Sequence, residues 1–220
     1  MKKIAVINGS PKAKDSVSTL LVDQVKNILE TELTVYQATK LKSQDDISAE
    51  LAQIIQSDVL LFVFPLYVDS LPAPLIKILG SLEHAAKTRG GLLPKVYAVC
   101  NCGFYEAEHT RIALEIIGNF CIRTGFRWGY GLGIGMGGIL LSVGKNMSRG
   151  PAANVYSALA ELCKSIQDNI ADNSSGAHNV FITPNFPRFL YSLGGNVSWR
   201  QMAKKYDAQK SLGARPHISG

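Results

Sequence analysis

The most constraining feature of the chain is an unbroken apolar run at residues 59–64, which reads Val-Leu-Leu-Phe-Val-Phe and is followed by Pro65. A strand with one face in water alternates apolar and polar residues, whereas a strand of a parallel sheet that is covered on both faces does not. The run therefore predicts a central strand of a parallel sheet with helices packed on both faces.

The rest of the chain supplies the other elements of such a fold. Further strands are predicted at residues 3–8, 33–37, 95–102 and 127–135, and helices at 18–30, 47–56, 72–83, 106–124 and 151–170. Because five strands alternate with helices, we expect an α/β fold with a doubly wound, five-stranded parallel sheet and helices on both faces. Residues 1–175 are assigned to this domain. Residues 176–220 are assigned to a basic, helical C-terminal extension that packs on the domain or on a partner subunit.

In a doubly wound sheet, ligands bind beyond the carboxyl ends of the strands. The first loop at this edge, residues 9–19, begins with Gly9 and is rich in hydroxyl groups; it contains Ser10, Lys12, Ser16, Ser18 and Thr19. Hydroxyls, a lysine and a helix N-terminus together favour a phosphate. The loop lacks the Gly-Lys-Ser/Thr of nucleoside triphosphate loops. An ordinary strand–helix turn with Ser18 as N-cap is the alternative.

Two more loops follow buried strands, at residues 65–72 and 101–106. They carry the aromatic side chains of Tyr67, Phe104 and Tyr105, which are suited to flank a flat ring system next to a phosphate site. The alternative is that each aromatic ring only covers one end of the core.

Glycines recur between Gly131 and Gly138, and Gly133, Gly135 and Gly138 give a formal G-x-G-x-x-G pattern. We expect no helix to begin at Gly138, and no acidic residue lies at the distance that would hold a ribose. The segment is therefore predicted to be a wall of the pocket or a close backbone contact, and not a second dinucleotide site.

The net charge is +6, and past Pro187 six basic residues stand against the single acid Asp207. Such a tail can attract nucleic acid or a phosphorylated small molecule, but its charges alternate with apolar residues at helical spacing, which favours a solvated basic helix. We expect no nucleic-acid partner. No apolar window is long enough to cross a membrane, and the N-terminus does not read as a signal peptide, so no membrane contact is expected. Four cysteines and four histidines show no metal-ligand spacing, and the cysteines favour a reducing, cytoplasmic setting.

Two motifs resemble those of the flavodoxin-like NAD(P)H-dependent FMN reductases. Residues 7–12 with Ser16, Ser18 and Leu20 are similar to that family's FMN-phosphate loop, and residues 64–77 are similar to its loop beside the isoalloxazine ring. The resemblance extends over about residues 1–170. It departs from the family at Lys12, where arginine is frequent, and at Asp15, an acid near a predicted dianion.

The resemblance implies a flavodoxin-like fold, FMN as the cofactor, NADPH or NADH as the electron donor and a homodimer. It implies an FMN-binding set consisting of Ser10, Lys12, Ser16, Ser18, Thr19, Pro65, Leu66, Tyr67, Val68, Asp69, Asn101, Cys102, Gly103, Phe104 and Tyr105. The implied activity is hydride transfer through flavin N5 to a small acceptor such as a quinone, a nitro compound or free flavin, with no catalytic side chain and no metal. One alternative is an FMN-binding electron carrier without its own NAD(P)H site, and another is a scaffold that has lost the cofactor.

Overall fold

The computed structural model describes residues 2–12, 15–40, 44–88, 91–168 and 178–214. The chain divides into two compact units, Met1–Asn185 and Phe186–Gly220. The predicted boundary between residues 175 and 176 lies outside the described residues.

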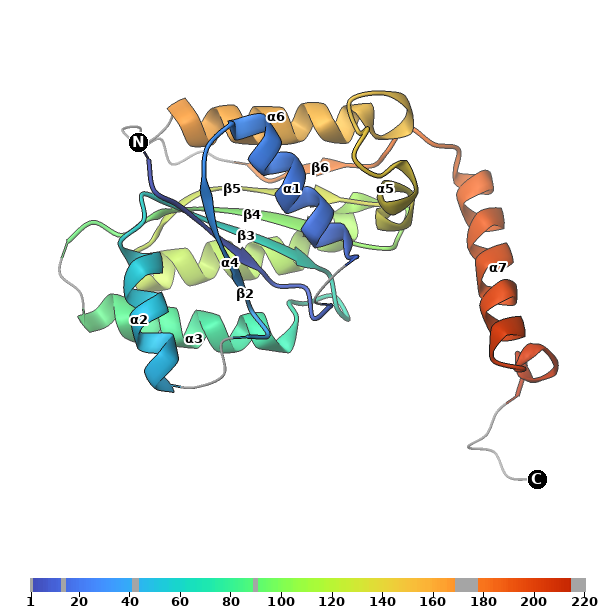
Figure 1. The fold of residues 1–220 in the computed structure, drawn as a ribbon, viewed down its shortest axis with the longest axis horizontal. Coiled ribbons are helices and arrows are strands. Elements are labelled where there is room, and N and C mark those ends of the chain that lie inside the picture. The colour runs from blue at the N-terminus through green and yellow to red at the C-terminus, as the bar shows by residue number, and fades with distance from the viewer. Residues whose placement is uncertain (1, 13–14, 41–43, 89–90, 169–177, 215–220) are drawn as a thin grey trace. The chain divides into compact units, whose positions relative to one another are not determined.

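A parallel sheet forms the centre of the first unit (Figure 1). Its strands are β1 (Ile4–Asn8), β2 (Leu33–Gln37), β3 (Val59–Pro65), β4 (Lys95–Asn101), β5 (Arg127–Ile134) and β6 (Val180–Ile182), in the order β2-β1-β3-β4-β5-β6. The doubly wound parallel sheet is confirmed, but the prediction of five strands is wrong. β6 pairs with β5 through only three residues, which are too few to give a recognisable strand pattern.

Helices cover both faces of the sheet, as Figure 1 shows. The first-unit helices are α1 (Val17–Leu29), α2 (Gln44–Ile55), α3 (Ala73–Thr88), α4 (Arg111–Thr124), α5 (Gly137–Val143) and α6 (Ala153–Asp168), with 3-10 turns at Ala107–Thr110 and Gly150–Ala152. α1, α5 and α6 lie on one face and α2, α3 and α4 on the other. Along β3, side chains enter the two cores alternately, so Phe62 packs with α3 and α4 and Leu61 with α1 and α6. This explains why the apolar run of β3 does not alternate.

The glycine-rich segment at the end of β5 differs in one respect from the prediction. A short helix, α5, does begin at Gly137, so the expectation of no helix there is wrong. The expected close backbone contact is confirmed: a Cβ at Gly135 would collide with the carbonyl oxygen of Tyr105 and come within 3.0 Å of the Ala107 nitrogen. Glycine is needed here because another stretch of backbone occupies the space of a side chain.

The second unit consists of α7 (Arg188–Lys205) and a 3-10 turn at Gln209–Ser211. Ala203 is its one buried apolar residue among those described. No helix in the described ranges has both the length and the apolar character that a membrane span requires.

Candidate functional site

The three predicted loops leave the sheet from neighbouring strands. β1 pairs with β3, and β3 pairs with β4, all in parallel, so their carboxyl ends lie at one edge. The strand order reverses at β1, because β2 lies on one side of it and β3 on the other. In an open α/β sheet this switch point is where the ligand crevice forms.

The first loop ends in a capped helix. Ser16 is the N-cap of α1, and its Oγ accepts a hydrogen bond from the Thr19 N–H at 3.1 Å. Ser18 lies inside the helix, so the alternative that made it the N-cap is wrong. The N–H groups of Val17 and Ser18 have no acceptor among the described residues, and they lie at the positive end of the helix dipole. This helix start can bind an anion.

The polar side chains of the first loop differ in how far they are exposed to solvent. Ser10 and Ser18 are only 2% and 1% exposed, whereas Lys12 is exposed. Ser10 Oγ accepts the Lys12 N–H at 3.2 Å, and the Ser16 and Thr19 hydroxyls lie 2.9 Å apart. The buried Ser10 and Ser18 therefore support the conformation of the loop, and the exposed Lys12 is the side chain that can contact a ligand.

Asn8, the last residue of β1, organises this loop, although it was not among the predicted site residues. Its Oδ1 accepts the Ser10 N–H at 3.0 Å, and its Nδ2 donates to Thr19 Oγ1 at 3.2 Å. The sequence does contain a signal for this role, because Asn8 is a polar residue at the end of an apolar strand, directly before Gly9. A buried amide needs hydrogen-bond partners, so such a residue is expected to bind the neighbouring loop.

Asn101, at the end of β4, connects all three loops. Its buried Nδ2 donates to Ser18 Oγ at 3.1 Å and to the Phe64 carbonyl at 3.1 Å. Its own carbonyl accepts the Leu66 N–H at 2.7 Å. One predicted residue thus joins the start of α1 to the ends of β3 and β4.

The second loop is a tight turn. Tyr67 and Ser70 exchange two backbone hydrogen bonds, of 2.9 and 3.0 Å, across Val68 and Asp69. These two residues have left-handed φ angles of 49° and 56°. For a β-branched residue this conformation is strained, and the Val68 side chain is 97% exposed at the tip. Tyr67 is 46% exposed, and Pro65 and Leu66 are partly buried at the base of the turn.

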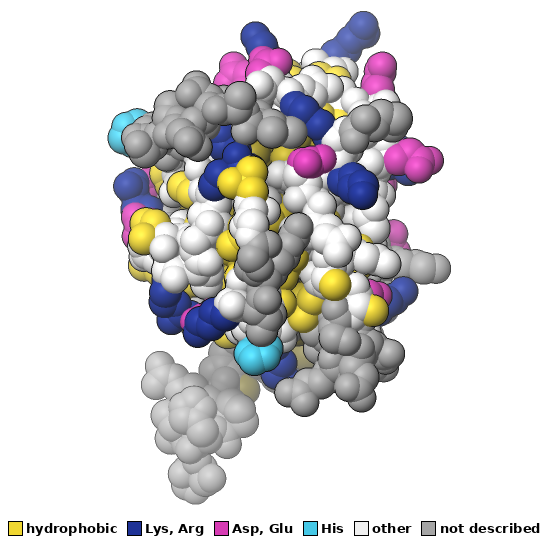
Figure 2. Space-filling view, turned by 90° about the vertical axis from the view of Figure 1, so that its left-hand side faces the viewer, with side chains coloured by type: hydrophobic (Ala, Val, Ile, Leu, Met, Phe, Trp, Pro, Cys, Tyr) yellow, Lys and Arg dark blue, Asp and Glu magenta, His cyan; other side chains and the backbone are white. Residues whose placement is uncertain are grey.

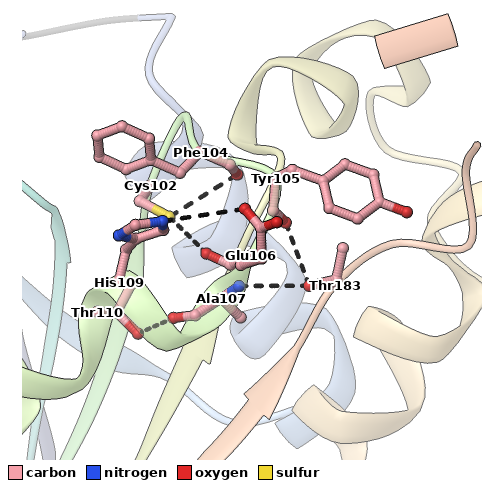
Figure 3. Close-up of polar contacts among 8 residues, drawn as sticks. All are labelled: Cys102, Phe104, Tyr105, Glu106, Ala107, His109, Thr110 and Thr183. Atoms are coloured by element: carbon pink, nitrogen blue, oxygen red, sulfur yellow. Dashed lines mark hydrogen bonds and ion pairs between the residues drawn. The ribbon is translucent and has the colours of Figure 1, made fainter. Parts of the chain in front are cut away.

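The third loop presents its two rings in different directions (Figure 3). Phe104, 52% exposed, stacks on His109 with centroids 4.4 Å apart. Tyr105 points the other way, and its carbonyl accepts a hydrogen bond from Thr183 Oγ1 at 3.2 Å. His109 Nε2 lies 3.9 Å from Glu106 Oε2. His109, Glu106 and Thr183 were not among the site residues predicted from the sequence, because only the fold places them beside the aromatic residues.

Cys102 and Gly103 complete the predicted set. Burial raises the pKa of the Cys102 thiol, and its Sγ lies 3.9 and 3.7 Å from the carbonyl oxygens of Phe104 and Glu106. A protonated, buried thiol is a poor nucleophile. Gly103 is exposed beside it. In the described ranges no group of three His, Cys, Asp or Glu residues is placed to hold a metal ion.

The comparisons with known proteins agree with this geometry. A family model described as NADPH-dependent FMN reductase matches residues 2–126, more than half of the chain. No curated protein sequence matches significantly.

Similar folds occur among solved structures. An NAD(P)H:quinone oxidoreductase from Methanothermobacter marburgensis has a TM-score of 0.57 at 17% identity, covering 76% of this chain and 98% of its own. General stress protein 14 from Treponema denticola, solved in complex with FMN, has a TM-score of 0.53 at 15% identity, with 74% and 99% covered. An oxidoreductase from Corynebacterium diphtheriae has a TM-score of 0.54 at 12% identity, with 74% and 93% covered. At these identities the similarity shows the flavodoxin-like fold alone. The family match and the fold together establish that the chain belongs to the NADPH-dependent FMN reductase family of oxidoreductases.

Proposed function

We propose that this chain binds FMN at the three-loop edge and passes a hydride from NADPH or NADH to a small acceptor such as a quinone, a nitro compound or free flavin. The observation that carries the proposal is the convergence of the loops after β1, β3 and β4 at the switch point, where Asn101 joins them. Family membership supports the same reading.

The residues present fit a flavin mononucleotide. The N–H groups at the start of α1, which have no acceptor among the described residues, and the exposed Lys12 would hold the phosphate dianion. The half-exposed rings of Tyr67 and Phe104 would flank the flat ring system, and the turn at Val68 and Asp69 would offer main-chain N–H groups to its edge. When bound, FMN supplies the hydride chemistry at N5. The protein's task is then to orient the ring and to leave one face accessible.

The site is open in a single copy of the chain, because the side chains at the tips of the second and third loops are exposed. We therefore propose that a second copy completes the site in a homodimer. Four buried, unbridged cysteines accord with a cytoplasmic setting.

A flavin titration tests the proposal. Purified protein should take up FMN with the absorption spectrum of a bound flavin, and NADPH or NADH should bleach it anaerobically. Lys12→Gln should weaken FMN binding about tenfold, because a charged contact to phosphate is lost. Lys26→Gln, the same change at the far end of α1, should leave it unaltered. Uptake without bleaching would identify an electron carrier, and failure to bind FMN would contradict the proposal.

A further inference from the structure

The third loop of the site contacts a segment that is distant from it in the sequence. Residues 178–185, which contain β6 and are called the β6 segment below, lie beyond residue 126, where the match to the family model ends. β6 pairs with β5 in parallel, so its carboxyl end lies at the same edge of the sheet as the three loops. The β6 segment is therefore placed to act on the candidate site.

Thr183, the residue directly after β6, uses its hydroxyl group twice (Figure 3). Its Oγ1 accepts a hydrogen bond from the Ala107 N–H at 3.3 Å and donates one to the Tyr105 carbonyl oxygen at 3.2 Å. These two backbone groups belong to the third loop and to the turn that follows it. Pairing in a sheet uses backbone groups only, so the hydroxyl serves the loop and not the strand.

The backbone of Thr183 is itself firmly held. Asn154 Nδ2 donates to the Thr183 carbonyl oxygen at 2.7 Å, and the Oδ1 of the same amide accepts the Val155 N–H at 3.0 Å. Directly before Thr183, the Ile182 carbonyl accepts the Gly135 N–H at 3.1 Å. A hydroxyl group on such a support can keep a loop in one conformation, because little further freedom is lost when it bonds.

The preceding part of the third loop is held by the glycine-rich segment. The Met136 N–H donates to the Phe104 carbonyl at 2.6 Å, and the Gly137 N–H donates to the Cys102 carbonyl at 2.8 Å. These bonds fix residues 102–104, whereas Thr183 fixes residues 105–107. The half-exposed Phe104 lies where the two sets of bonds meet, so the position of its ring depends on both.

An alternative is that the β6 segment only extends the sheet. Asn179 Oδ1 accepts the Gly131 N–H at 2.9 Å, and the Phe181 ring centroid lies 5.0 Å from the Arg111 guanidinium. These contacts attach the segment to β5 and α4 whatever residue follows β6. The alternative therefore predicts that valine, which has the shape of threonine and favours strands, can replace Thr183 without effect on the site.

We propose that Thr183 is a positioning residue of the FMN site. Its hydroxyl group fixes the backbone of the third loop, and the loop thereby presents Phe104 to the flat ring system. The inference rests on the proposed function, in which Phe104 flanks the bound flavin. Thr183 thus acts on the ring side of the site, whereas Lys12 acts on the phosphate side.

The test is equilibrium titration of the full-length protein with FMN and with riboflavin, which lacks the phosphate. Thr183→Val removes both hydrogen bonds and should weaken the binding of both flavins about three- to tenfold. Lys12→Gln should weaken the binding of FMN alone, because riboflavin has no charge for it to contact. Thr183→Ser keeps the hydroxyl group and should bind both flavins within about twofold of the wild type.

Thr124→Val is the matched control. Thr124 is also half-buried, and its hydroxyl also donates to a backbone carbonyl, that of Phe120, at 2.7 Å. It is the last residue of α4, which begins at the edge with the three loops and ends at the opposite edge of the sheet (Figure 1). Figure 2 shows the molecule from that opposite side, where Lys and Arg are interspersed with Asp and Glu. Flavin affinity should not change in this variant.

Hydrogen exchange in the flavin-free protein measures the loop directly. Mass spectrometry of a peptide that covers residues 103–110 should show faster exchange in Thr183→Val, because the Ala107 N–H loses its acceptor. Thr183→Ser and Thr124→Val should exchange as the wild type does.

Four results would overturn the inference. They are wild-type riboflavin affinity in Thr183→Val, no recovery in Thr183→Ser, an equal loss in Thr124→Val, and unchanged exchange of the loop in Thr183→Val. Wild-type protein that binds neither flavin would contradict the proposed function instead. The exchange measurement would then still decide whether Thr183 holds the third loop.

Discussion

The two units of the chain differ in how they use their apolar side chains. In the first unit, two cores fill the space between the sheet and its helices, and side chains such as Phe62, Leu61 and Leu114 are fully buried. In the second unit, Phe189, Trp199 and Tyr206 are each about 70% exposed within the chain. Burial of apolar area stabilises a fold, so the packing of the first unit accounts for most of the folding stability. The second unit instead carries most of the net positive charge. This comparison leads to four predictions.

The largest expected effect comes from the same substitution made in each unit. Phe62→Ala opens a cavity in the centre of the sheet and should lower the free energy of unfolding by about 3–5 kcal/mol. Phe189→Ala, in α7, should change it by less than about 0.5 kcal/mol, because that ring is exposed. Urea denaturation followed by tryptophan fluorescence and circular dichroism measures both. A large loss for Phe189→Ala would show that the second unit is packed on another surface.

The next largest effect concerns Asn101. Asn101→Ala leaves Ser18 Oγ and the Phe64 carbonyl without a buried donor, so the free energy of unfolding should fall by about 1–3 kcal/mol. FMN affinity should fall with it, since the loops lose their connection. Asn196→Ala, on the exposed surface of α7, is the control and should alter neither quantity. Unchanged stability of Asn101→Ala would mean that water replaces the amide.

A third prediction uses pH to distinguish the units, because all four cysteines lie buried in the first unit. Burial raises the pKa of Cys163 to about 12 and also raises the pKa of Cys100, Cys102 and Cys121. A raised folded-state pKa gives stability that is complete below the unfolded pKa of about 8.5 and is lost as pH rises through the folded pKa. The free energy of unfolding should therefore decline from about pH 8.5 towards pH 12, by at most about 1.4 kcal/mol per pH unit for each thiol.

Denaturation curves at a series of alkaline pH values measure this decline. Cys163→Ala should make its slope shallower, because one group no longer titrates on unfolding. An identical slope in that variant would contradict the assignment to Cys163. Thiol reagents should modify the native protein slowly and the unfolded protein at once.

The smallest expected effect is at Val68. Val68→Gly removes the strain of a left-handed β-branched residue, which outweighs the added chain entropy, so the protein should gain about 0.5 kcal/mol. Val35→Gly, on an exposed strand position, gains no such relief and should lose about 0.5–1 kcal/mol. Equal losses in the two variants would show that the turn is not strained.

The predictions from sequence succeeded where one strong local pattern was sufficient. The apolar run at β3 predicted a parallel sheet that is covered on both faces. The hydroxyl-rich loop before α1 indicated the edge of the sheet at which the loops converge. They failed at β6, which has only three residues, and at α5, whose seven residues are too few to show helical periodicity. Among the site residues, Asn101 was predicted to line a ligand and is found connecting the loops.

The sequence by itself determined the fold class, because alternating apolar strands and helices admit few arrangements, and it determined where the net charge lies. Only the tertiary structure decided which polar groups are buried against one another, such as Asn8 with Ser10 and Asn101 with Ser18. Only the tertiary structure placed Thr183 beside Tyr105 and Ala107. The reason is physical: periodicity is a local property of the chain, whereas hydrogen bonds between loops depend on segments that meet only after folding.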